Sequence, residues 1–133
     1  MEWSKRDGIP TMTEQKVAGM TLSAVRDCLH CDVLAGDDRL DTMVDSVAAS
    51  DGMSAVLAAL CRRALLVTGL ANIQSVRTAH VADLAAILYV RGVRPCDKTI
   101  AMAREKRIVL LSTTHNMFDS CGILHRQGLR GVT

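Results

Sequence analysis

Four short runs of almost uninterrupted apolar residues, each followed by a helical pattern, constrain the fold of this chain more than any other feature. The runs are residues 47–50, 64–68, 85–90 and 108–112. Strands buried on both faces are apolar throughout, whereas half-exposed strands alternate apolar and polar residues. Short strand–helix–strand units form right-handed crossovers between parallel strands. The sequence therefore predicts one α/β domain with a mostly parallel sheet and helices on both faces.

The helical stretches are recognised by apolar residues spaced three or four apart. The residues that mark them are Met53, Val56, Leu57 and Leu60 after the first run, Ile73, Val76 and His80 after the second, and Met117, Cys121 and Leu124 after the fourth. Between the third and fourth runs, Asp97 follows Pro95 as the expected N-cap, and basic residues close the helix near Lys106.

A short helix and a strand are expected ahead of this series. Thr21 is a favourable N-cap, and an apolar helical face follows at Leu22, Val25 and Leu29. A strand is predicted at residues 32–34. Residues 1–19 carry charges of both signs, glycine and proline, so we expect a flexible leader there and a domain at residues 20–133.

Composition restricts the partners and the compartment. Sixteen basic and fourteen acidic residues give a net charge of +2, and aromatic residues are 2% of the chain, so neither a nucleic-acid surface nor a membrane-binding face is favoured. The chain shows neither a signal peptide nor an apolar run long enough to span a membrane, which predicts a cytoplasmic protein. Its five cysteines are therefore expected to be free thiols.

Polar residues follow two of the predicted strands. They are Thr68, Gly69 and Asn72 after the second run, and Ser112, Thr113 and Thr114 after the fourth. If the strands ending in Thr68 and Ser112 are neighbours, two helix N-termini converge there and bind a small anion at the carboxyl edge of the sheet. The alternative is that these residues are only helix caps and turn residues. Arg91 and Arg94 either add positive charge to this edge or are solvated surface arginines.

Catalytic and metal motifs are weak. Cys28 and Cys31 have the spacing of a redox or metal pair, but the sequence offers no companion ligands at a matching spacing, and buried thiols are the alternative. The glycines form neither a dinucleotide fingerprint nor a Walker phosphate loop. His115 and Cys121 lie nearly two helical turns apart, which does not suit a nucleophile and its base. We expect no enzyme activity, cofactor or metal.

Several segments resemble the DRTGG domain family over about residues 20–130. The matching segments are residues 20–25, 31–36, 64–69, Asn72-Ile73-Gln74, residues 85–90 followed by Gly92 and Pro95, and residues 108–112. Residues 40–45 stand where the signature that names the family would lie. The resemblance implies a non-catalytic regulatory module similar to the N-terminal domain of HPr kinase, of a type that accompanies CBS domains or phosphotransacetylase catalytic domains and associates in pairs.

Two functional hypotheses follow. The first is a regulatory, ligand-sensing or scaffolding homodimer that binds a small anionic metabolite, a nucleotide or a protein partner. The second is a thiol- or metal-dependent accessory protein in redox-enzyme maturation of the hydrogenase type, since some domains of the resembling family occur near iron hydrogenase genes. Residues 22–34 and 40–44 are the expected dimer contact, because they lie outside the regular strand–helix series.

Overall fold

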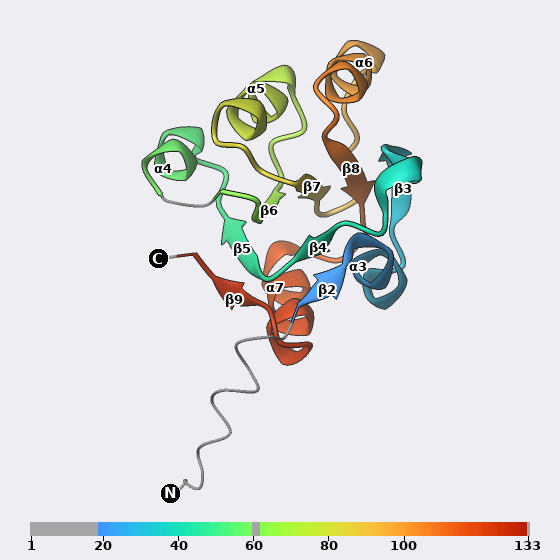
Figure 1. Ribbon diagram of the computed structural model, residues 1–133, viewed down its shortest axis with the longest axis vertical. Coiled ribbons are helices and arrows are strands. Elements are labelled where there is room, and N and C mark those ends of the chain that lie inside the picture. Colours follow the sequence, from blue (N-terminus) through green and yellow to red (C-terminus); the bar gives the residue numbers. More distant parts are fainter. Residues whose placement is uncertain (1–18, 60–61, 133) are drawn as a thin grey trace, which may run out of the picture.

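The computed structural model describes residues 19–59 and 62–132 (Figure 1). Its elements in chain order are β2 (Met20–Thr21), α3 (Leu22–Leu29), β3 (Asp32–Ala35), the 3-10 helix η1 (Asp37–Arg39), β4 (Met43–Val44), β5 (Ser46–Ala49), α4 (Met53–Ala58), β6 (Leu65–Thr68), α5 (Ile73–Val81), β7 (Ala86–Tyr89), α6 (Asp97–Glu105), β8 (Val109–Ser112), α7 (Met117–Arg126) and β9 (Arg130–Gly131). Residues 1–18, where a leader was expected, lie outside the described residues.

The predicted fold class is confirmed. The four apolar runs form β5, β6, β7 and β8, which are adjacent and parallel within a six-stranded sheet of order β3-β8-β7-β6-β5-β9. At one edge β3 pairs antiparallel with β8, and at the other β9 pairs parallel with β5. The two-residue strands β2, β4 and β9 were not predicted, because two residues are too short for a period-2 pattern to be visible.

The helices cover the two faces unequally. Side chains of α4, α5 and α6 belong to one buried cluster, and those of α3 and α7 belong to the other (Figure 1). From β5 to β8 the chain advances across the sheet one strand at a time, but from β8 it returns across the whole sheet to β9. A right-handed crossover in this reversed direction places α7 on the opposite face from α4–α6.

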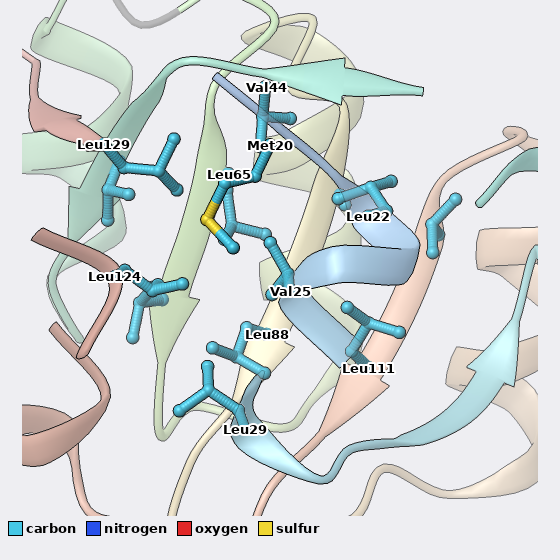
Figure 2. Packing of buried hydrophobic residues seen from close by; sticks show 14 of the residues in the cluster. Met20, Leu22, Val25, Leu29, Val44, Leu65, Leu88, Leu111, Leu124 and Leu129 are labelled. Atoms are coloured by element: carbon cyan, nitrogen blue, oxygen red, sulfur yellow. The ribbon is translucent and has the colours of Figure 1, made fainter. Parts of the chain in front are cut away.

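Alternate residues of each central strand enter the two clusters. Figure 2 shows Leu65, Leu88 and Leu111, one from each of β6, β7 and β8, packed with the buried face of α3. Their neighbours Leu66, Ile87 and Leu110 point into the other cluster. These side chains are 0% exposed, and burying a leucine contributes about 1.5–3 kcal/mol. Burial on both faces explains why the runs lack alternation.

Two details of the helical predictions were wrong. Met53 and Val56 are buried as expected, but Leu57 is 47% exposed and His80 is also exposed, because α4 and α5 each contact the sheet along a narrow stripe. Leu60 lies outside the described residues. The N-cap of α6 is Cys96, and Asp97 occupies the first turn. There the positive end of the helix dipole still stabilises the Asp97 carboxylate.

The predicted cap of α3 is present. The Thr21 side chain accepts a hydrogen bond from the Ala24 backbone nitrogen at 3.1 Å. Asn72 caps α5 in the same way, and Asn116 caps α7 by accepting from the Asp119 nitrogen at 2.7 Å. Within the described ranges, no helix is both long and apolar enough to cross a membrane.

Candidate ligand-binding site

The two polar turns share one edge of the sheet but are not adjacent. Thr68 of β6 is opposite Tyr89 of β7, and Tyr89 is opposite Ser112 of β8, so a whole strand separates them. The condition for a shared site, that these two strands are neighbours, is not met, because each crossover advances by one strand in chain order. The two helix N-termini do not converge either, since α5 and α7 lie on opposite faces of the sheet.

Most of the predicted polar side chains form internal hydrogen bonds. Ser112 Oγ donates to the Val93 carbonyl at 3.2 Å, and Thr113 Oγ1 donates to the Leu29 carbonyl at 2.8 Å. Asn72 Oδ1 accepts from the Ser75 nitrogen at 3.3 Å. Asn72 and Thr114 are the exposed members of the set. The cap and turn interpretation therefore describes Asn72, Ser112 and Thr113.

Asp51 is a functional candidate that the sequence reasoning missed. Its Oδ1 accepts two hydrogen bonds, one from the Gly69 backbone nitrogen at 2.7 Å and one from Thr68 Oγ1 at 2.9 Å. The bond from Gly69 is the main reason that the pKa of Asp51 is lowered, with smaller contributions from Thr68 and from the charge of Arg91. The signal was available, since Asp51 follows the first apolar run just as Gly69 follows the second.

Arg91 lies over the turn after β6. A Cβ atom on Gly69 would come within 2.7 Å of Arg91 Cζ, so a larger residue here would displace the flexible guanidinium from this position. The Arg91 backbone has a φ of 61° and donates to the His115 carbonyl at 2.7 Å, which fixes its turn to the one after β8. Among the described residues, Arg91 has no carboxylate within ion-pair distance. Its exposed guanidinium is a cation available to a ligand.

The connections leaving β7 and β8 run to opposite faces of the sheet. The first leads to α6 and the second to α7, which makes this the point where the direction of winding reverses. Ligands of open α/β sheets bind at such points, beyond the carboxyl ends of the strands. Exposed residues here include Arg91, Gly92 and Thr114. Gly92 has a φ of 70°, and its nitrogen donates to the Thr113 carbonyl at 2.8 Å.

Arg94 has a structural role. Its guanidinium forms an ion pair with Asp32 of β3, on the far side of β8 from β7. Both side chains are largely exposed to solvent. The surface-arginine interpretation therefore fits Arg94, whereas Arg91 differs in having no such partner in the described part of the chain.

The Cys28 and Cys31 thiols are held in the protonated form. Burial raises the pKa of Cys31 to about 12, and burial also raises the pKa of Cys28. Both pack against the cluster under α3 and α7. Metal ligands and redox nucleophiles are thiolates, so this environment opposes both roles. In the described residues, no group of three or more potential ligand side chains is placed to hold a metal ion. Cys61 lies outside them.

Comparison with known proteins gives a similarity of fold. No family model and no curated protein matches the sequence. The crystal structure of the CBS and DRTGG domains of the regulatory region of Clostridium perfringens pyrophosphatase, complexed with the activator diadenosine tetraphosphate, matches with a TM-score of 0.67 and 12% identity. The match covers 96% of this chain and 54% of that one. This chain thus has the fold found within a regulatory region that contains CBS and DRTGG domains.

Proposed function

We propose that this chain is a non-catalytic regulatory domain of the DRTGG type that senses a small anionic ligand, a nucleotide or a phosphorylated metabolite. The observation that carries the proposal is the exposed Arg91 guanidinium at the carboxyl edge, at the point where the winding of the sheet reverses. Among the described residues it has no carboxylate within 4.0 Å, although its charge acts on the Asp51 carboxylate. The similarity of fold to a regulatory region that binds a nucleotide activator supports it.

In the proposed complex, Arg91 contacts the anionic group and Thr114 offers its exposed hydroxyl. Gly69 keeps the space that the guanidinium occupies. The other predicted residues, Thr68, Asn72, Ser112 and Thr113, hold the surrounding turns in shape through the hydrogen bonds described above. Charge-assisted hydrogen bonds from an arginine contribute about 1.5–3 kcal/mol each, enough to give Arg91 a measurable share of the affinity.

The test is a thermal-shift screen followed by calorimetry, with ATP, ADP and diadenosine tetraphosphate as probes. Binding to the native state must raise the melting temperature. We expect Arg91→Gln to weaken the binding of a positive probe by at least about tenfold. Arg126→Gln, a change of an exposed arginine on α7, is the matched control and is expected to leave binding unchanged. If no probe binds, or if Arg91→Gln binds like the wild type, the proposal is wrong.

We further propose that the domain acts as a homodimer. Leu22, Val25 and Leu29, within the expected contact, are 0–1% exposed in the core of one chain and are not available for a partner. Met43, in the second expected contact, is 54% exposed and remains available. Light scattering at micromolar concentration is expected to give about twice the chain mass of 14.4 kDa, and Met43→Lys to shift it toward the monomer. A monomeric wild type would contradict this proposal.

A further inference from the structure

The amino edge of the sheet, opposite the site described above, contains a cavity of about 240 Å³. It lies beneath η1, where the chain turns from α5 into β7 and from α6 into β8. Ionisable residues from four segments line it. They are Arg39, Arg63, His80, Asp83, Lys106 and Arg107.

The positive charge of this cavity is largely uncompensated. Asp83 is the one carboxylate in the described lining, and it pairs with Arg62 at 3.0 Å. Arg39 pairs with Asp38 at 3.3 Å. Arg63, Lys106 and Arg107 have no carboxylate within 4.0 Å among the described residues. Three cations therefore share one small cavity with a single described carboxylate, and that carboxylate is paired with Arg62.

The helix dipoles account for only part of this charge. The C-terminal ends of α5 and α6 reach this edge, and each presents roughly half a negative charge, which favours nearby lysine and arginine. Two helix ends together offset about one of the three cations. About two positive charges remain, more than helix capping explains.

Three residues of the cavity lining have left-handed backbone conformations. Arg63 and Arg107 have φ angles of 64° and 60°, in the left-handed region that glycine adopts most readily, and Asp83 has a φ of 57°. The Arg63 nitrogen donates to the Asp83 carbonyl at 2.7 Å, which joins two of the turns. Asp83 and Arg107 directly follow the C-caps of α5 and α6, a position where helices commonly end in this conformation, so these turns fix where the chain leaves each helix.

We infer that this cavity binds a phosphate or diphosphate group, as a second anion site of the domain. Its volume is below the range of about 300–1,000 Å³ that holds a drug-sized ligand, so it suits a diphosphate better than a whole nucleotide. The four-residue strands separate it from the carboxyl edge by roughly 13 Å. The two sites are therefore independent, and the inference does not rest on the proposed function.

Inorganic pyrophosphate, with orthophosphate and sulfate for comparison, is the probe for calorimetry on the full chain. We expect pyrophosphate to bind most tightly of the three, with an affinity that falls as salt is raised. Lys106→Gln and Arg107→Gly are each expected to weaken it by at least about tenfold. The glycine change also relieves the left-handed backbone at residue 107, so it removes the charge without endangering the fold.

Two control variants test whether pyrophosphate binds in this cavity or elsewhere on the domain. Lys98→Gln removes an exposed lysine at the other end of α6 and is expected to bind pyrophosphate like the wild type. Arg91→Gln, which changes the carboxyl edge, is expected to do the same. The inference is overturned if pyrophosphate does not bind at millimolar concentration, if Lys98→Gln weakens it as much as Lys106→Gln, or if only Arg91→Gln abolishes binding.

Discussion

The Asp51 carboxylate, which follows β5, accepts a hydrogen bond from the Gly69 backbone nitrogen, which follows β6, at a distance of 2.7 Å. The turn after β6 is therefore held by a side chain from the neighbouring turn. Thr68 reinforces this arrangement, because its hydroxyl donates to the same oxygen atom and accepts from the Leu70 nitrogen at 3.1 Å. These bonds position the glycine beneath the Arg91 guanidinium.

Removing the Asp51 carboxylate is expected to destabilise this edge of the sheet. Asp51→Ala deletes the acceptor of two hydrogen bonds, and the free energy of unfolding is expected to fall by about 1–3 kcal/mol. Asp51→Asn keeps an acceptor oxygen and is expected to lose less. Urea denaturation of the three proteins at pH 7 measures the difference. If Asp51→Ala and the wild type have equal free energies of unfolding, these two hydrogen bonds do not stabilise the fold.

The Asp51 carboxylate is also expected to make the free energy of unfolding depend on pH in the acidic range. The pKa of Asp51 is lower in the folded chain than its ordinary value of 3.8. Its charged form therefore stabilises the fold fully above the unfolded pKa, and this contribution is lost as the pH falls through the lower folded pKa. The stability difference between the wild type and Asp51→Asn is expected to narrow between pH 5 and about pH 2, as followed by urea denaturation at each pH. A constant difference would contradict the prediction.

The buried pair of Ser75 and Tyr89 allows a test of hydrogen-bond direction. Ser75 Oγ donates to the Asn72 carbonyl at 2.7 Å, so the Tyr89 hydroxyl, also 2.7 Å from Ser75 Oγ, must be the donor to serine. Tyr89→Phe leaves Ser75 with its other partner and is expected to cost about 1 kcal/mol. Ser75→Ala leaves the buried tyrosine hydroxyl without its acceptor and is expected to cost more, about 2–3 kcal/mol. If thermal denaturation shows a larger loss of stability for Tyr89→Phe than for Ser75→Ala, the tyrosine is not the donor in this hydrogen bond.

Cys96 is expected to be the most reactive of the four described cysteines. It is exposed at the N-terminus of α6, and the Thr99 hydroxyl lowers the pKa of its thiol together with backbone N–H groups, whereas burial raises the pKa of Cys28, Cys31 and Cys121. Iodoacetamide at pH 7.5 should label Cys96 first in peptide mass spectrometry. Thr99→Val removes the hydrogen bond between the Thr99 hydroxyl and the Cys96 thiol, and it is expected to slow the labelling of Cys96.

The Cys28 and Cys31 thiols are expected to be dispensable for folding and for metal content. In the double change Cys28→Ser and Cys31→Ser, a serine at position 28 can still donate to the Val25 carbonyl, which now accepts from Cys28 Sγ at 3.5 Å. We expect a folded domain, less stable by about 1–2 kcal/mol, with unchanged metal content by elemental analysis. A stoichiometric metal that disappears in the double variant would instead support the thiol hypothesis.

The central sheet was predictable because its signal is local. Strands covered on both faces need apolar side chains at every position, so β5 to β8 could be located within a residue or two at each end. The antiparallel pairing of β3 with β8 was not predictable, since nothing in the four-residue strand specifies its partner. It depends on contacts between segments far apart in the chain.

The candidate site was predictable only in part. Turn residues at strand ends could be found, because the carboxyl edge follows from strand direction alone. The order of the strands, and the face to which each helix returns, decide which turns meet. Strand order and helix placement depend on the whole topology. As a result, Asp51 and Arg91 lie at the turn of Gly69, whereas Ser112 is at the end of a strand two positions away in the sheet.

The hydrogen bond from Thr113 Oγ1 to the Leu29 carbonyl spans 84 residues, whereas β5 to β8 each pair with the next strand along the chain. Closing a long loop costs more chain entropy than closing a short one, so contacts between near neighbours form first. The face covered by α4, α5 and α6 is consequently expected to assemble early in folding. The face covered by α3 and α7 is completed only when the first and last described elements meet, and these elements are expected to be the first to separate when the protein is unfolded.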